Sequence, residues 1–173
     1  MSTENEFRSG FVAIVGRPNT GKSTLVNALV GSKVVITSPH PNTTRHAIRG
    51  IVNEPDFQAI LVDTPGVHKP KTLLGKRLNA VVEESLDSVD VIIICLPADE
   101  ESGAGDQYII DEIAKHPRSK KIALVTKTDL ISKANLANRL ASIMAMAKGF
   151  TWDEIVPVSA VTHEQIDLLK KLI

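Results

Sequence analysis

The chain has 173 residues, 43% of them hydrophobic, and its 20 basic and 20 acidic residues leave no net charge. This length fits a single domain with a full hydrophobic core, and the composition argues against intrinsic disorder. The balanced charge argues against tight nucleic-acid binding by this domain alone. No apolar stretch is long enough for a transmembrane helix, and the polar, acidic start is unlike a secretory signal.

The charges are unevenly distributed along the chain. Residues 7–53 contain no Asp or Glu, whereas residues 78–114 contain ten acidic residues and no Lys or Arg. Most of these charges are expected on solvated faces, but the acid-free segment also offers the positive field that an anionic ligand needs. The single cysteine, Cys95, lies in an apolar run, which favours a buried, inert thiol and a cytoplasmic location.

Three strands and one helix are predicted in the first part of the chain. The apolar run 11–15 has the character of a buried strand and precedes a glycine-rich turn and an amphipathic helix at 22–30. Residues 47–53 and 58–63 are further strands, joined by the turn-like Asn53-Glu-Pro-Asp56. Because this connection is so short, we expect an antiparallel hairpin.

The second part of the chain is predicted to alternate helices and strands. Ser132 is a plausible cap for a long helix, and Thr162-His-Glu-Gln165 has capping-box spacing for a final helix. The pattern predicts an α/β fold over 1–173, with a mostly parallel six-stranded sheet, one antiparallel strand and helices on both faces. The expected elements are helix 73–86, strand 89–96, helix 107–114, strand 121–126, helix 132–147, strand 155–158 and the final helix.

The segment Gly16-Arg-Pro-Asn-Thr-Gly-Lys-Ser23 matches the phosphate-loop pattern G-x-x-x-x-G-K-[ST] in full, between a predicted strand and a helix. Such glycines let backbone N–H groups surround phosphates, and the helix N-terminus adds positive partial charge. Lys22 is expected to reach the β- and γ-phosphates, and the Ser23 hydroxyl to bind Mg²⁺. The pattern indicates a P-loop NTPase fold, with a plain glycine-rich turn as the alternative. The predicted nucleotide-binding residues here are Gly16, Arg17, Pro18, Asn19, Thr20, Gly21, Lys22, Ser23 and Thr24.

A second motif, Asp63-Thr64-Pro-Gly66, ends a predicted strand 41 residues after Lys22. In such a position Asp63 can hold Mg²⁺ through water, and the Gly66 amide can sense a γ-phosphate. Asp63, Thr64 and Gly66 are therefore predicted to join the nucleotide site.

Two later motifs favour guanine over adenine. Asp129 follows a strand in Thr126-Lys-Thr-Asp129, and its carboxylate can accept hydrogen bonds from both N1–H and the exocyclic amine of guanine, a pair of donors that adenine lacks. Ser159-Ala160 follows another strand, where a backbone N–H can bind guanine O6. The residues predicted here are Thr126, Lys127, Asp129, Leu130, Ser159, Ala160 and Val161.

With these motifs, the chain resembles the Era family of bacterial GTPases from about residue 11 to its end. Besides the phosphate loop, the resemblance rests on Thr43-Thr-Arg-His46, Asp63-Thr-Pro-Gly-Val-His68 and Asp153-Glu-Ile-Val-Pro-Val-Ser-Ala160. It implies a GTP-hydrolysing switch that assists small ribosomal subunit assembly and 16S rRNA maturation. The alternative within the superfamily is the GTPase domain of a related ribosome-assembly or tRNA-modification GTPase.

The resemblance also implies partners and a domain organisation. Era proteins couple the GTPase domain to a C-terminal KH domain that binds rRNA, and no KH Gly-x-x-Gly segment follows here, so we expect the GTPase domain alone. Expected partners are a guanine nucleotide and, through the KH domain, 16S rRNA and the small subunit. The full protein could also associate peripherally with a membrane, and this domain is expected to be monomeric.

The family's pattern implies further site residues. Thr44 is expected to bind Mg²⁺ and to act in catalysis with Lys22 and Gly66. Val67 stands where many GTPases have a glutamine that orients water, so intrinsic hydrolysis should be slow. Asn19 is a candidate K⁺ ligand beside the phosphates, with a plain turn residue as the alternative.

One departure from the family concerns the base-reading motif, which begins with Thr126 where asparagine is usual. A threonine hydroxyl can take over part of the bracing role of the amide, and guanine selectivity should survive because Asp129 is intact. Two other classes compete with a GTPase switch. One is an ATPase or small-molecule kinase, and the other is a nucleotide-gated binding module whose turnover is incidental.

Overall fold

The computed structural model describes residues 7–31, 47–63 and 85–173. Thr43, Thr44, Thr64, Gly66, Val67 and His68 lie outside these ranges, as does most of the predicted helix 73–86, of which Ser85 and Leu86 are described and are helical. The elements in chain order are β1 (Arg8–Val15), α1 (Lys22–Val30), β2 (Ala47–Asn53), β3 (Phe57–Asp63), β4 (Val91–Pro97), α3 (Ala104–Ile113), β5 (Lys120–Thr126), η1 (Thr128–Leu130), α4 (Lys133–Met144), β6 (Glu154–Pro157) and α5 (Ile166–Leu172).

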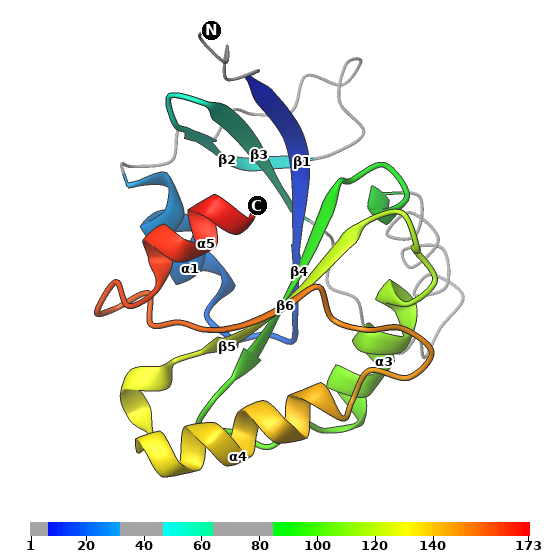
Figure 1. The fold of residues 1–173 in the computed structure, drawn as a ribbon, viewed down its shortest axis with the longest axis vertical. Coiled ribbons are helices and arrows are strands. Elements are labelled where there is room, and N and C mark those ends of the chain that lie inside the picture. The colour runs from blue at the N-terminus through cyan, green and yellow to red at the C-terminus, as the bar shows by residue number, and fades with distance from the viewer. Residues whose placement is uncertain (1–6, 32–46, 64–84) are drawn as a thin grey trace, which may run out of the picture.

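The six strands form one sheet in the order β2-β3-β1-β4-β5-β6. The β2–β3 pair is antiparallel, as the short turn predicts, and the other pairs are parallel. Parallel strands need crossover connections, and α1, α3, α4 and α5 alternate with the strands along the chain (Figure 1). The predicted α/β fold with a mostly parallel six-stranded sheet is confirmed.

Each face of the sheet carries its own hydrophobic core. On one face, α1 and α5 pack through residues such as Leu25 and Leu169 against β1, β4 and β5. On the other face, α3 and α4 pack through residues such as Ile110 and Ile143 against the alternate residues of the same strands (Figure 1). Because it is covered on both sides, β4 is buried along its whole length.

Cys95 lies in this central strand with no exposed surface, as predicted. Burial raises the pKa of its thiol to about 12, and the positive charge of Lys22 only partly opposes that rise. The thiol is therefore protonated and unreactive at neutral pH. Among the described residues, none of the helices is both long enough and apolar enough to cross a membrane.

Two helix starts differ from the sequence pattern. The capping-box prediction at Thr162 is wrong, because α5 begins at Ile166 after Gln165, which has a left-handed φ of 61° and makes no side-chain cap. Helix α3 begins at Ala104, three residues earlier than predicted, where the Asp106 carboxylate accepts from Gly103 N at 2.9 Å. By contrast, Ser132 caps α4 as predicted, with its hydroxyl accepting from Asn135 N at 3.3 Å.

Candidate nucleotide-binding site

The phosphate loop connects the end of β1 to α1 in a conformation that only glycine permits at two positions. Gly16 has φ 148°, and a Cβ there would lie 2.9 Å from both the Cys95 carbonyl and the Thr20 hydroxyl. Gly21, directly before the helix, has φ 91°. Asn19 also has a positive φ of 63°, which asparagine adopts more readily than most side chains.

Side chains of the loop hydrogen-bond to its own backbone. The Lys22 ammonium lies 2.8 Å from the Gly16 carbonyl and 2.5 Å from the Arg17 carbonyl. The Thr20 hydroxyl donates to the same Arg17 carbonyl at 2.9 Å. The first turn of α1 contains no acidic residue, so the positive end of its dipole and the lysine act together. This arrangement suits a phosphate group.

Thr126, at the end of β5, holds the phosphate loop through a hydrogen bond. Its hydroxyl donates to the Thr20 carbonyl at 2.7 Å, and both residues are buried. The threonine thus makes a loop-to-loop bond of the kind expected from the asparagine that is usual at its position. A buried hydrogen bond of this kind is costly to lose, since the carbonyl would be left without a partner.

The loops after β5 and β6 are tied to each other by side chains. Ser159 is buried and its hydroxyl donates to the Asp129 carboxylate at 2.6 Å, while the same oxygen accepts from Thr162 N at 3.2 Å. The Thr128 hydroxyl donates to the Glu164 carboxylate at 3.2 Å. Asp129 itself is exposed, so a carboxylate of fixed orientation faces outward between the two loops.

A cavity of about 270 Å³ lies between these loops and the start of α1. Eight of its lining residues were predicted from the sequence, namely Gly21, Thr24, Thr126, Lys127, Asp129, Leu130, Ala160 and Val161. Leu25 and Val158 also line it and were missed, because they belong to the hydrophobic core and carry no polar signal. The apolar lining with one carboxylate suits a flat heterocycle with a polar edge.

Other predicted residues lie beside this cavity rather than in its wall. Gly16, Arg17, Pro18, Asn19, Thr20, Lys22 and Ser23 belong to the adjoining phosphate loop, and Ser159 lies behind Asp129. The Arg17 side chain turns away from the loop toward α3, and the Ser23 hydroxyl lies 3.5 Å from an Arg49 guanidinium nitrogen. Asp63 ends β3 in register with Ile14 of β1, which places its backbone at the same sheet edge as the loop.

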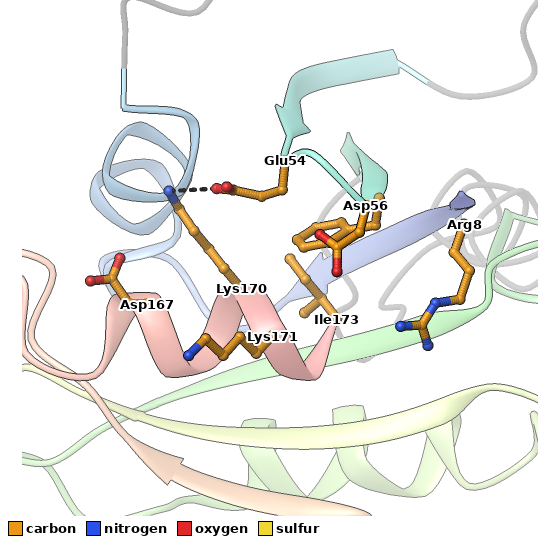
Figure 2. A pocket seen from close by; sticks show the side chains of 8 residues that line it. Arg8, Glu54, Asp56, Asp167, Lys170, Lys171 and Ile173 are labelled. Carbon is orange, nitrogen blue, oxygen red and sulfur yellow. Dashed lines mark hydrogen bonds and ion pairs between the residues drawn. The ribbon is translucent and has the colours of Figure 1, made fainter. Parts of the chain in front are cut away.

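A larger cavity, of about 640 Å³, lies at the opposite end of β1, where that strand begins (Figure 2). It is lined by three basic and three acidic side chains, namely Arg8, Lys170, Lys171, Glu54, Asp56 and Asp167. The Lys170 ammonium and the Glu54 carboxylate form an ion pair at 3.1 Å. These charges balance, and none of the sequence-predicted site residues lies there. The smaller cavity is the better candidate site because the phosphate loop and Asp129 converge on it.

A phosphate loop after the first strand, a carboxylate-bearing loop after β5 and a mostly parallel sheet of this order define a P-loop nucleotide-binding domain. The sequence pattern of the family described as 50S ribosome-binding GTPase matches residues 11–128, which is more than half of the chain. The chain belongs to this GTPase family.

Individual relatives point to the same branch of the family. The chain is 56% identical to GTPase Era of Nocardioides sp. over 168 residues, which cover 96% of this chain and 54% of that protein. It is similar to the crystal structure of an Aquifex aeolicus Era variant bound to GDP and aluminium fluoride, with a TM-score of 0.76, 36% identity and coverage of 95% and 55% of the two chains. It is also similar to Era in complex with MgGDPNP and nucleotides 1506–1542 of 16S ribosomal RNA, with a TM-score of 0.74, 36% identity and coverage of 96% and 56%. The chain spans about half the length of these relatives.

Proposed function

We propose that this domain binds GTP and hydrolyses it to GDP and phosphate, and so acts as a molecular switch. The observation that carries the proposal is the Asp129 carboxylate, held by Ser159 at a cavity that adjoins the phosphate loop. A carboxylate that accepts two hydrogen bonds selects guanine, since adenine lacks the adjacent pair of an N1–H and an exocyclic amine. The Thr126–Thr20 bond joins the base-reading and phosphate-binding halves of the site.

The phosphates would lie over the loop and the N-terminus of α1. Lys22, whose ammonium now contacts the Gly16 and Arg17 carbonyls, would turn to the β- and γ-phosphates and stabilise the charge that develops between them. Ser23, Asp63 and Thr44 would hold Mg²⁺, and hydroxyl and carboxylate oxygens are the ligands that this ion prefers. The ion would neutralise phosphate charge during hydrolysis. The Gly66 amide would report the presence of the γ-phosphate.

The proposal is tested by competition and by turnover. Displacement of a fluorescent GDP analogue should require at least about a hundredfold less GTP than ATP, because a site whose carboxylate accepts from a pair of donors on the base rejects a base that lacks that pair. Phosphate release from GTP should depend on Mg²⁺ and be slow without a partner. Equal displacement by ATP would instead favour an ATPase or kinase.

We further propose that Asn19 helps to bind K⁺ beside the phosphates. The support is its position in the phosphate loop, exposed and with a left-handed backbone, together with the missing glutamine at Val67. Asn19→Gly removes the side chain and keeps a residue that accepts this backbone conformation. Hydrolysis by the original chain should be faster in K⁺ than in Na⁺, and Asn19→Gly should lose that difference. Equal rates in the two salts for the original chain would exclude the role.

We propose that the whole protein acts in the cytoplasm on the small ribosomal subunit, with 16S rRNA as a partner. The support is the relative solved with a 16S rRNA segment, and the chain covers about half of that relative. The RNA contact is therefore proposed for the natural full-length protein, in which the resemblance predicts a KH domain. Filter binding of a 16S 3′-end RNA by the full-length protein, with this domain as the comparison, tests it. No binding by the full-length protein would overturn it.

A further inference from the structure

The segment that follows β4, residues 98–106, contacts both halves of the candidate site through acidic side chains. Asp106 accepts from Arg17 Nε at 2.8 Å, and Glu100 accepts from Arg17 Nη2 at 3.1 Å, so the phosphate loop is tied at its second residue. At the same time, Asp99 lies 4.0 Å from the Lys127 ammonium in the base-reading loop. One short segment thus pairs with both loops.

Asp106 is the strongest member of this segment because it is fully buried. One of its carboxylate oxygens accepts from Arg17, and the other accepts from the Gly103 backbone N–H at 2.9 Å, at the start of α3. A buried carboxylate is costly unless it is paired and hydrogen-bonded, and here each oxygen has a partner. The hydrogen bond to Asp106 is the main reason that the pKa of Arg17 is raised, so the guanidinium stays charged.

Close packing of Arg17 against α3 restricts the movement of the Arg17–Asp106 ion pair. A Cβ at Gly105, in the first turn of α3, would lie 3.1 Å from Cδ of Arg17, so the helix backbone contacts the arginine stem. From α4, the buried Arg139 donates from Nε and Nη2 to the Pro97 carbonyl at 3.2 and 3.1 Å. The segment is therefore held at its start by Arg139 and at its end by Asp106.

The backbone carbonyl of Arg17 connects this ion pair to the part of the loop that would face phosphate. Its carbonyl accepts from both the Lys22 ammonium and the Thr20 hydroxyl, so its position sets where these two groups lie. The Thr20 carbonyl in turn accepts from Thr126. A displaced Arg17 would therefore shift the phosphate-binding groups directly, whereas the Asp129 carboxylate is held separately, by Ser159.

We propose that Asp106 is a positioning residue for nucleotide binding, which acts through Arg17 to hold the phosphate loop in the conformation that accepts phosphates. The inference rests on the proposed function only in that the ligand is a guanine nucleotide. A merely structural ion pair would stabilise the fold and leave the relative affinities for different nucleotides unchanged. A positioning role would instead change the relative affinities for nucleotides that differ in their number of phosphates.

The test compares GDP with GMP, which share the base and differ in one phosphate. In Asp106→Asn and in Arg17→Gln, the ratio of GDP affinity to GMP affinity should fall about tenfold, within the coupling expected for contacting charged residues. The double variant should lose no more than either single variant. Asp111→Asn is the matched control, because this residue lies on the exposed side of the same helix and accepts from Gln107, and it should keep the original ratio.

Folding is measured by urea unfolding of each variant without nucleotide. If Asp106→Asn fails to fold, Glu100→Gln replaces it, because Glu100 is exposed and pairs with the same arginine; a smaller fall in the same ratio is then expected. Unchanged ratios in the folded variants, or losses that add in the double variant, would overturn the proposal. Failure of the original chain to bind either nucleotide would instead overturn the proposed function, so the two results are distinguishable.

Discussion

The phosphate and base halves of the candidate site are built in different ways. In the phosphate half, the shape comes from backbone conformation, with left-handed φ values at Gly21 and Asn19 and a contact at Gly16 that leaves no room for a Cβ. In the base half, the shape comes from side-chain hydrogen bonds, which join Ser159 to Asp129 and Thr128 to Glu164.

This difference indicates which half of the site tolerates changes of residue type. Backbone strain and close contact restrict a position to one residue type, so the phosphate half is recognisable from a short motif. A side-chain hydrogen bond can be made by any donor of suitable reach, so Thr126 can stand where asparagine is usual and still bond to Thr20. Changes in the two halves should therefore differ in size and in which nucleotides they affect.

The largest effect is expected from Gly16→Ala. The new Cβ would lie 2.9 Å from the Cys95 carbonyl at a φ of 148°, so the loop must shift. We expect a loss of at least about 2 kcal/mol in binding of every nucleotide tested, GTP and ATP alike, measured by titration calorimetry. Gly149→Ala is the control: its φ is 78° but a Cβ would meet no described atom within 4 Å, so it should affect stability and leave nucleotide affinity unchanged. Normal binding by Gly16→Ala would show that the contact does not decide loop shape.

A smaller and more selective effect is expected from Asp129→Asn in the base half. Loss of a charged acceptor should weaken GTP binding by about 2–3 kcal/mol, while the amide that replaces it can donate to the C2 oxygen of xanthine. The ratio of GTP to XTP affinity should therefore reverse, as measured by competition. Asp167→Asn, an exposed carboxylate on α5, is the control and should bind as the original chain does. An unchanged ratio would remove Asp129 from base recognition.

The bond between the two halves is tested by Thr126→Val, which keeps the shape of the side chain and removes its donor. The buried Thr20 carbonyl would lose this partner, at a cost of about 1–2 kcal/mol in stability and in nucleotide affinity together. Thr126→Asn should bind within a few-fold of the original chain, since its amide can donate to the same carbonyl. Urea unfolding and GDP titration measure both quantities. Equal behaviour of the valine and asparagine variants would mean that the bond is not needed.

The smallest effect is expected at Glu164. Glu164→Ala removes the acceptor of the Thr128 hydroxyl, and because Glu164 is exposed, the loss should be about 0.5–1 kcal/mol. Mg-GDP should dissociate a few-fold faster in a stopped-flow displacement experiment. Glu164→Gln retains a side-chain oxygen and should dissociate at close to the original rate. A faster rate in both variants would point to charge rather than to this hydrogen bond.

The strands and the phosphate loop could be predicted because their signals are local. Apolar runs mark β1, β4 and β5, and the loop motif stands between a strand and a helix. The predicted start of α5 is wrong because His163 and Gln165 adopt left-handed φ values of 60° and 61°. Such values are uncommon for residues other than glycine, so the sequence contains no signal for them.

Contacts between distant residues could not be predicted for a different physical reason. Arg17 and Asp106 are 89 positions apart, and neither periodicity nor spacing relates them before the sheet brings α3 to the phosphate loop. Glu164 was likewise overlooked as a partner of the base-reading loop, since an exposed glutamate near a helix start usually indicates only solvation or capping. The polarity of single residues therefore located the candidate site but not the network that supports it.

The burial of Cys95 has a practical consequence for labelling experiments that follow conformational changes of this domain. It is the only cysteine of the chain, it has no exposed surface, and its thiol stays protonated at neutral pH. A thiol-reactive dye or spin label added to the folded protein should therefore find nothing to modify. One cysteine introduced at an exposed site, as in Arg118→Cys or Lys148→Cys, would carry the label alone, with no native cysteine to remove first.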